Sequence, residues 1–189
     1  MDEKKSVDEF INDNRIIYMS GKFTEEKAQD VISQLLKFNF DDPKKDILMI
    51  IDSYGGIVDS FIAIHDTMRL IRCDVATLCI GKAMSCGHLL LTSGTKGKRF
   101  ITPNSRIMVH QVSAGTWGKL SEMENSVEET KRLEAIINKL ILKYSKVTKK
   151  KLSDLLGKDS YLSPEKGLEL GFVDVIVRAP SNLYSKLRL

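Results

Sequence analysis

The sequence predicts an α/β fold, in which helices cover a largely parallel sheet. Short apolar runs of strand length recur along the chain, as at 46–52 and 75–80. Segments with helical periodicity separate these runs, which is the alternation typical of parallel sheets. The chain has 189 residues, a length that suits one well-packed domain. We therefore expect a single domain over residues 1–189.

The first predicted elements are a helix, a strand and a second helix. Residues 24–38 have a helical apolar stripe, and Thr24 is the expected N-cap. The stripe consists of Ala28, Val31, Ile32, Leu35 and Leu36. D-I-L-M-I-I-D at 46–52 is the unbroken apolar run of a strand with both faces covered, and it ends in S-Y-G-G. Residues 57–71 have helical periodicity, so the strand at 75–80 should complete a right-handed crossover.

The next segment is predicted to be a helix followed by two strands. After Gly81 the pattern turns helical through three consecutive leucines at 89–91. K-R-F-I-T and R-I-M-V-H-Q then indicate strands on either side of a Pro103-Asn104 turn. Ser85 is therefore expected where a strand gives way to a helix.

One long helix is expected from Ser121 to about Lys146. Glutamates gather in its first turns and lysines in its last turns, as the helix macrodipole favours. Its apolar stripe must be buried against another surface. The stripe consists of Met123, Val127, Leu133, Ile136, Ile137, Leu140 and Ile141. Two short helices near 149–156 and 164–170 follow, and F-V-D-V-I-V is the last strand.

Composition and charge argue against several classes of protein. Hydrophobic residues make up 42% of the chain, too many for a disordered protein. A net charge of +4 is spread along the sequence, so nucleic acid is not an expected partner. No run approaches the roughly 20 apolar residues of a membrane span, and the charged start, M-D-E-K-K-S-V-D-E-F, is unlike a signal peptide. We expect a cytoplasmic protein that does not bind membranes.

The three cysteines do not suggest a metal site. They are odd in number and lack the C-x-x-C spacing of zinc ligands. We expect reduced thiols and no bound metal.

A nucleophile is predicted in the stretch I-G-K-A-M-S-C-G-H-L-L at 80–90. A serine hydroxyl attacks only with a base beside it and with preorganised donors for the oxyanion, which the first turn of a helix can supply. M-S-C-G resembles the second half of a G-x-S-x-G elbow, and Gly87 allows a substrate to approach closely. Ala83 stands where that elbow has its first glycine. The alternative is that Ser85 only caps the helix.

Three histidines compete as the base. His65 lies in the middle of a predicted helix beside Ile64 and is read as structural or surface-exposed. His88 is three residues after Ser85 and can share its helical face. His110 ends a predicted strand, where side chains of open α/β sheets point into the ligand crevice, so it is better placed. Spacing alone selects no orienting carboxylate.

From about residue 14 to residue 177 the chain resembles the proteolytic subunit of the ATP-dependent Clp protease. The matching blocks are N-R-I-I-Y-M-S-G, I-D-S-Y-G-G, C-I-G-K-A-M-S-C-G, K-G-K-R-F-I-T-P-N-S-R-I-M-V-H-Q and K-D-S-Y-L-S-P-E-K-G-L-E-L-G-F-V-D. The resemblance implies a ClpP/crotonase-like fold of repeated β-β-α units with a protruding handle helix. The handle, a strand and a helix, would occupy about 113–147.

The resemblance assigns the site residue by residue. Ser85 becomes the nucleophile, His110 the general base and Asp159 the orienting carboxylate. The backbone N–H groups of Gly56 and Cys86 become the oxyanion hole, so Cys86 contributes an amide and not a thiol. His88, which stands where close relatives often have alanine, becomes a bystander.

The resemblance also implies partners. Proteins of this family form two stacked seven-membered rings that enclose the active sites, and an AAA+ unfoldase docks outside and consumes the ATP. Unfolded polypeptides and short peptides are the substrates, and the chain itself needs no cofactor. The segment G-T-W-G would lie in a strand that pairs with substrate backbone by β-addition. Its residues are Gly115, Thr116, Trp117 and Gly118.

The chain departs from the family pattern in three places. The axial segment, residues 1–13, is short. The expected docking pocket for the unfoldase lacks the family's usual aromatic residues and consists of Leu48, Ile50, His65 and Leu70. Gly157 and Lys158 replace a charged pair that links the two rings in relatives. Ring pairing should then be weaker, or need a second kind of subunit.

Two other functions stay open beside that of a serine endopeptidase. An acyl-CoA hydratase or isomerase of the crotonase fold also uses a Gly-Gly turn to stabilise an oxyanion, but it has no need of Ser85, His110 and Asp159 together. A mainly structural subunit of a mixed ring tolerates loss of the triad, which this chain has kept. The complete triad favours the endopeptidase.

Overall fold

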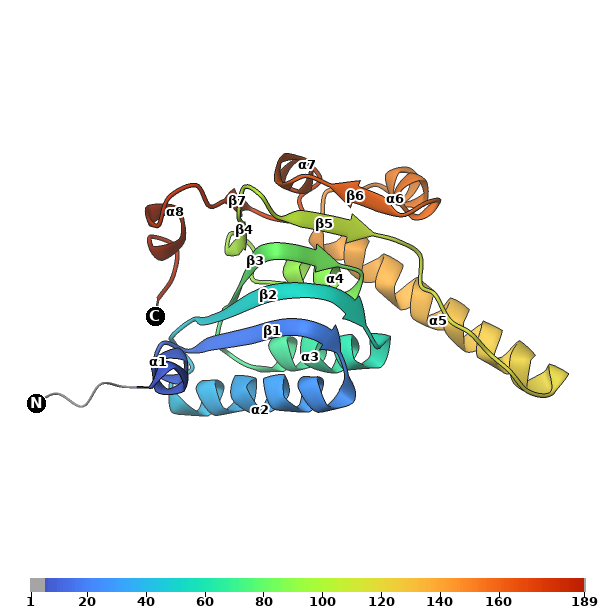
Figure 1. The fold of residues 1–189 in the computed structure, drawn as a ribbon, viewed down its shortest axis with the longest axis horizontal. Coiled ribbons are helices and arrows are strands. Elements are labelled where there is room, and N and C mark those ends of the chain that lie inside the picture. The colour runs from blue at the N-terminus through green and yellow to red at the C-terminus, as the bar shows by residue number, and fades with distance from the viewer. Residues whose placement is uncertain (1–5, 189) are drawn as a thin grey trace, which may run out of the picture.

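A mainly parallel seven-stranded sheet organises the fold (Figure 1). The structure is a computed structural model and describes residues 6–188. The strands are β1 Ile16–Phe23, β2 Ile47–Gly56, β3 Val75–Met84, β4 Arg99–Ile101, β5 Arg106–Val109, β6 Ser160–Leu162 and β7 Val175–Ile176. The helices are α1 Val7–Asp13, α2 Glu25–Asp41, α3 Val58–Leu70, α4 Cys86–Thr92, α5 Leu120–Tyr144, α6 Lys149–Leu156, α7 Pro164–Glu169 and α8 Ser181–Tyr184.

The long strands β1, β2 and β3 are each divided into two parts by an irregularity in pairing or a change of partner. The pairing of β2 with β3 shifts register between Ile51 and Ser53. β3 pairs with β4 through residues 77–79 and with β5 through residues 82–84. A helix follows each divided strand, which gives the predicted β-β-α repeat. The α/β prediction is confirmed.

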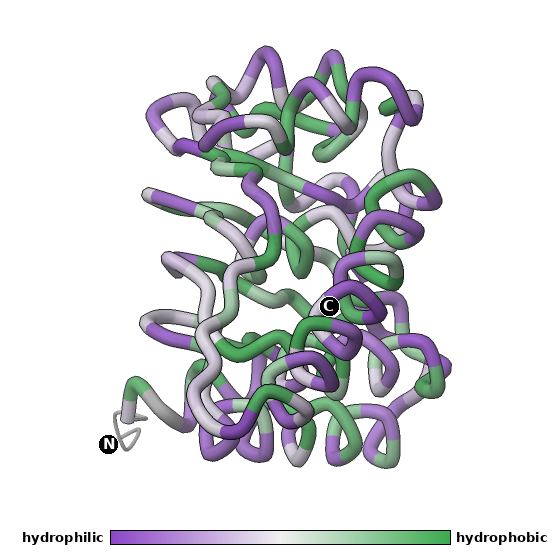
Figure 2. The backbone as a smooth tube through the Cα atoms, turned by 90° about the vertical axis from the view of Figure 1, so that its right-hand side faces the viewer, coloured by the Kyte–Doolittle hydropathy of each residue, from purple (hydrophilic) through white to green (hydrophobic). Residues whose placement is uncertain are grey.

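The two faces of the sheet are covered very differently. α2, α3, α4 and the last turns of α5 pack on one face and bury the larger part of the core. In Figure 2 the helical turns alternate between hydrophilic and hydrophobic colours, as amphipathic helices should. On the apolar core of the other face, α8 is the one helix among residues 6–188, and its Leu183 packs among the side chains of β2, β3 and β4. These side chains are Leu48, Ala76, Leu78 and Phe100.

α2 confirms the first predicted helix and corrects one member of its stripe. Thr24 caps it, because its hydroxyl accepts a hydrogen bond from the backbone N–H of Lys27 at 3.1 Å. The helix extends to Asp41, beyond the predicted end. Leu36 is 52% exposed, and Phe38 is the buried residue at that end of the helix.

The region around Ser85 begins differently from the prediction. The helical pattern expected after Gly81 is wrong, because β3 continues to Met84 and α4 begins only at Cys86. Residues 82–84 are held in the strand by pairing with β5, a contact that the sequence alone does not reveal. Ser85 nevertheless lies between the strand and the helix, as predicted.

α5 confirms the long helix and projects from the body of the molecule (Figure 1). Only Ile137 and Ile141 of its stripe are buried, whereas Met123 is 38% and Val127 47% exposed. Residues 110–118 form no strand, so the strand expected at the start of the handle is wrong for the single chain. Of the axial segment, 1–5 lie outside the described residues and Val7–Asp13 form α1.

Candidate active site

The pairing of β3 with β5 brings Ser85 close to His110. Met84, the last residue of β3, lies opposite Met108 of β5. The backbone N–H of Ser85 donates to the carbonyl of Met108 at 3.0 Å. Both side chains therefore emerge at the carboxyl ends of parallel strands, where open α/β sheets bind ligands. Ser85 and His110 line the same cavity of about 50 Å³.

The pairing of β5 with β6 brings Asp159 opposite His110. These strands are antiparallel, with Val109 opposite Ser160, so the next pair outward is His110 with Asp159. Asp159 Oδ1 lies 3.9 Å from His110 Nδ1, which aligns the two groups without a hydrogen bond. The side chains are 63% and 26% exposed, respectively. The three predicted triad residues thus come from three adjoining strand ends.

Ser85 has the backbone of a catalytic elbow. Its φ of 52° and ψ of −123° lie in a region that residues other than glycine rarely adopt. Such a conformation costs on the order of 1–3 kcal/mol and persists only where the surroundings impose it. The Ser85 side chain makes no capping hydrogen bond to α4. The geometry therefore does not support the alternative of a simple helix cap.

Two glycines at the end of β2 pack closely against their neighbours: Gly55 against Ser85, and Gly56 against β1. A Cβ atom on Gly55 would lie 2.7 Å from Ser85 Cβ, and φ there is +99°. A Cβ atom on Gly56 would lie 2.5 Å from the carbonyl oxygen of Phe23, with φ at +153°. Ser53 holds this turn, because its Oγ accepts from the backbone N–H of Gly55 at 3.0 Å. A side chain at Gly55 would therefore push the turn away from Ser85, and one at Gly56 would push it away from β1.

Cys86 is suited to contribute its amide. It is the first residue of α4, and the first N–H groups of a helix have no intrahelical acceptor. Its side chain is buried, and Sγ donates to the carbonyl of Gly56 at 3.4 Å. Burial raises the pKa of the Cys86 thiol, although the hydrogen bond to Gly56 opposes this. The thiol is therefore protonated at neutral pH, and protonated thiols are poor nucleophiles.

His88 is buried, although it lines the same cavity as Ser85. Its ring meets the Phe172 ring edge-on at 4.4 Å between centroids. Nε2 has no hydrogen-bond partner in the described part of the chain, and burial lowers the pKa of His88 to about 3. A group with that pKa is a poor base at neutral pH.

His65 is a structural residue. Nδ1 lies 2.7 Å from Asp66 Oδ1, and Nε2 lies 3.0 Å from the Tyr144 hydroxyl. Its side chain is buried with both nitrogens bonded, so His65 offers little surface to a partner in the single chain; its place in the expected docking pocket stays a prediction. Of the three histidines, only His110 lies in the cavity of Ser85 with a carboxylate opposite.

The other three expected docking residues do not form one surface either. Leu48 is buried in the apolar face beneath α8, and Ile50 packs against the same cluster. Leu70 ends α3 and is 85% exposed. α3 packs on the opposite face of the sheet.

The expected substrate strand lies beside α5. Gly115 and Thr116 line a groove of about 480 Å³ with residues of α5, and Trp117 is 98% exposed. Gly118 has φ at +147°, and a Cβ atom there would lie 2.5 Å from Glu122 Oε2. The segment is open to solvent and pairs with no strand among residues 6–188.

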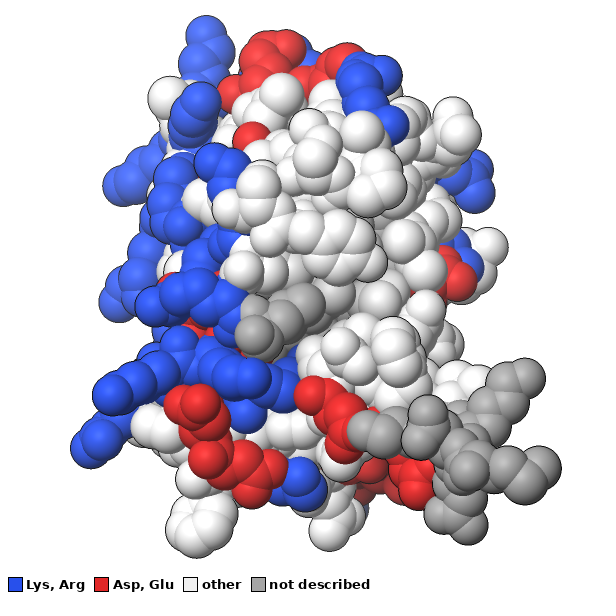
Figure 3. Space-filling view, turned by 90° about the vertical axis from the view of Figure 1, so that its left-hand side faces the viewer, with Lys and Arg blue, Asp and Glu red and all other residues white. Residues whose placement is uncertain are grey.

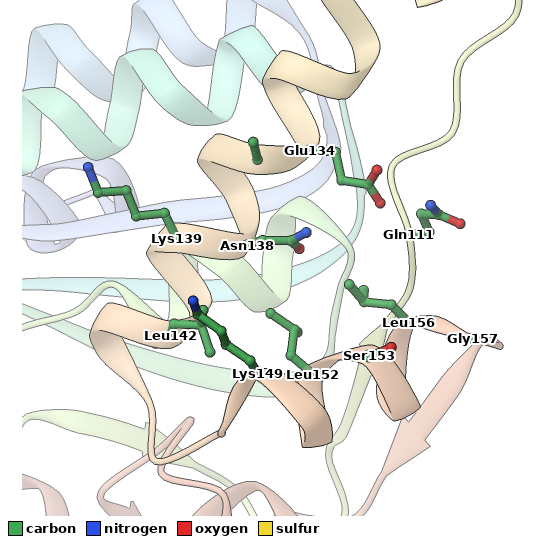
Figure 4. A pocket seen from close by; sticks show the side chains of 11 residues that line it. Gln111, Glu134, Asn138, Lys139, Leu142, Lys149, Leu152, Ser153, Leu156 and Gly157 are labelled. Atoms are coloured by element: carbon green, nitrogen blue, oxygen red, sulfur yellow. The ribbon is translucent and has the colours of Figure 1, made fainter.

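A large cavity lies apart from the triad residues. It has a volume of about 750 Å³ and lies between α5 and α6, with Gln111 at its edge (Figure 4). Leu152 and Leu156 line it beside the polar ends of Glu134 and Lys149. Gln111 also lines the cavity of Ser85, so the two hollows adjoin. Gly157 belongs to its wall, and the neighbouring Lys158 is exposed.

Residue-level reasoning missed two parts of this site. It did not predict β6, which carries Asp159 to His110, because a three-residue strand has no readable period. It also did not single out Ser53 and Gly55, although the S-Y-G-G turn was the available signal.

The described residues contain neither a membrane-spanning helix nor a cluster of metal-binding side chains. No helix among residues 6–188 is long and apolar enough to cross a membrane. No group of three or more His, Cys, Asp and Glu side chains in that range could hold a metal ion.

Comparison with protein families identifies the family of the chain. The family model described as Clp protease matches residues 2–180 of the 189. The match includes Ser85, His110 and Asp159. It confirms the resemblance seen in the sequence blocks.

Proposed function

Because this chain belongs to the Clp protease family, whose members are serine peptidases, we propose that it is the proteolytic core subunit of an ATP-dependent protease. Ser85, His110 and Asp159 form its catalytic triad. The observation that carries the proposal is the convergence of the three residues at adjoining strand ends, with Ser85 in a left-handed elbow. A helix cap or a structural serine has no need of that arrangement.

In the proposed mechanism Ser85 Oγ attacks the carbonyl carbon of a peptide bond while His110 Nε2 takes the hydroxyl proton. The backbone N–H groups of Gly56 and Cys86 stabilise the oxyanion. His110 passes the proton to the leaving amine. A water molecule, deprotonated by His110, then hydrolyses the acyl-enzyme. Asp159 orients His110 and stabilises its charged form.

Oligomer formation is part of the proposal. Clp proteases act in oligomeric assemblies with unfoldases. The exposed apolar residues of α5, such as Met123 and Val127, support burial against another subunit. We propose two stacked heptameric rings, built from this chain alone or with a second subunit of the same type. An AAA+ unfoldase would feed unfolded polypeptide into the chamber, and ATP would bind the unfoldase and not this chain.

The test is labelling with a serine-directed fluorophosphonate together with cleavage of short fluorogenic peptides. The wild-type protein should be labelled and should cleave peptides, and Ser85→Ala should do neither. The protein alone should leave a stably folded substrate intact until an unfoldase of the Clp type and ATP are added. A correctly assembled wild-type protein that is neither labelled nor active would refute the peptidase proposal and favour a structural subunit. Rapid digestion of the folded substrate without ATP would refute the enclosed chamber.

A further inference from the structure

A cavity that shares no lining residue with the cavity of Ser85 is lined by positive charges. It has a volume of about 330 Å³ and lies where the end of α3, the loop before β4 and the end of α5 meet. Arg69, Lys96, Arg99 and Lys143 line it together with Tyr144. No carboxylate belongs to its lining. Four cationic side chains around one hollow are the composition of an anion site.

Two of these cations converge on one aromatic ring. The Tyr144 ring lies 5.8 Å from Arg69 Cζ and 4.8 Å from Lys143 Nζ, measured to the ring centroid. Burial lowers the pKa of His65, Asp66 opposes this, and the charges of Arg69 and Lys143 lower it further. The charges of Arg69 and Lys143 therefore both act on the buried imidazole of His65. Like charges that line one cavity repel each other, and an anion bound in that cavity would relieve the repulsion.

The carboxylates near the cavity are already engaged. Asp174 is bound by Arg99 through two side-chain nitrogens, at 2.7 and 2.8 Å. It also accepts from the backbone N–H groups of Gly97 and Arg99, at 2.7 and 3.3 Å, and lies 3.8 Å from Lys96 Nζ. Asp66 is bonded to His65. Within residues 6–188, neither Arg69 nor Lys143 has a carboxylate at ion-pair distance; Arg69 donates only to the Ser93 carbonyl, at 3.0 Å. Donors on both side chains stay available to a ligand.

The floor of the cavity is rigid. Arg99 is 1% exposed, and its Nη1 donates to the carbonyls of Thr92 and Tyr144 at 3.1 and 2.6 Å. The ends of α3 and α5 favour a cation in their last turns, which accounts for Arg69 and Lys143 one at a time. This preference does not explain why Arg69 and Lys143 line the same cavity as Lys96 and the buried guanidinium of Arg99. Figure 3 shows Lys and Arg gathered in a band along one side of the end where the parallel strands begin.

We propose that this cavity binds a small phosphorylated molecule through Arg69, Lys96 and Lys143. A phosphoryl group offers several oxygens to donors that arrive from three elements, and its double charge matches the excess of cations. A single carboxylate would engage fewer of them. The site is independent of the proposed peptidase chemistry.

The experiment is a calorimetric titration of the full chain with inorganic pyrophosphate at low and at physiological salt. We expect one site, weakened by salt. The Arg69→Gln, Lys143→Gln double variant should bind at least tenfold more weakly. The control is Lys139→Gln with Lys150→Gln, which removes the same charge from exposed positions outside this cavity and should change the affinity less than twofold. Acetate should not compete.

A second readout uses the wild-type protein alone. Pyrophosphate should shift the backbone amide resonances of Gly94 and Ser145, which line the cavity. This keeps the test decisive even if the double variant folds poorly. Absence of heat and of shifts at 10 mM pyrophosphate would overturn the proposal. So would equal binding of pyrophosphate by the double variant, or displacement of pyrophosphate by an equal concentration of acetate.

Discussion

The nucleophile side and the acid–base side of the proposed triad differ in how firmly the surrounding structure holds them. On the nucleophile side, Ser85 is fixed between the Gly55 turn and the first residue of α4, and Cys86 is 1% exposed. On the acid–base side, Asp159 is 63% exposed and stands 3.9 Å from His110. The chain after His110 forms no strand up to residue 118. Ser85 is therefore held by the packed core, whereas His110 and Asp159 lie at the solvent-exposed edge of the site.

This difference indicates what a partner subunit must supply. The strained backbone of Ser85 is maintained by core packing, so the nucleophile needs no outside help. His110 and Asp159 need only a small movement to form a hydrogen bond. A neighbouring surface that covered these two exposed residues would favour that movement. We infer that assembly completes the acid–base half.

Replacing the nucleophile should have the largest effect. Ser85→Ala should lower kcat/KM for peptides by at least about four orders of magnitude, because triad members act as a unit. The matched variant Cys86→Ala should stay within about tenfold of wild type, because only its amide takes part. Peptide cleavage and fluorophosphonate labelling measure both. A Cys86→Ala protein as inactive as Ser85→Ala, with unchanged circular dichroism, would contradict the assignment.

Removing the base should be nearly as severe. His110→Ala should lower kcat by about three to four orders of magnitude, whereas His88→Ala should keep activity in the assembled protein. The physical reason is that His110 has a carboxylate opposite it and His88 has a buried ring with a pKa of about 3. Native mass has to be verified for each variant. If His88→Ala alone abolished labelling, the base would have to be reassigned.

A methyl group behind the serine should damage stability and activity together. Gly55→Ala places Cβ 2.7 Å from Ser85 Cβ at φ +99°, so we expect a loss of about 2–4 kcal/mol in unfolding free energy. Gly97→Ala is the control, because its φ is +87° but nothing lies within 4 Å of the added Cβ. It should cost about 1 kcal/mol and leave labelling intact. Equal effects of the two variants in chemical denaturation would contradict the packing account.

The smallest expected effect is a pH dependence of stability. The pKa of His88 is lowered to about 3 in the folded chain from 6.5, so the unfolded chain binds the extra proton between these values. Its contribution to stability is present above pH 6.5 and is lost as the pH falls toward 3. Between pH 6.5 and about 4.5 the wild type should lose roughly 2 kcal/mol more than His88→Leu. Parallel pH profiles of the two proteins would contradict the burial of a neutral imidazole.

The same division separates what the sequence predicts from what it does not. The apolar run of β2 and the periodicity of α2 are local patterns, and the structure confirms both. Ser85 is recognisable because an elbow leaves a local motif. Asp159 is not, because its place depends on the register of a three-residue strand far along the chain. The exposed start of α5 shows a second limit, since its expected burial requires a surface that residues 6–188 of the single chain do not provide.

The most direct test of the division is fluorophosphonate labelling resolved by native mass. Val127→Lys places a charge on the exposed apolar face of α5, and Asn125→Lys places the same charge on a neighbouring exposed polar position. We predict that Val127→Lys yields smaller, folded species that label at least tenfold more slowly than the wild-type assembly, while Asn125→Lys assembles and labels normally. A folded single chain that labels as fast as the full assembly would contradict the claim that assembly completes the site.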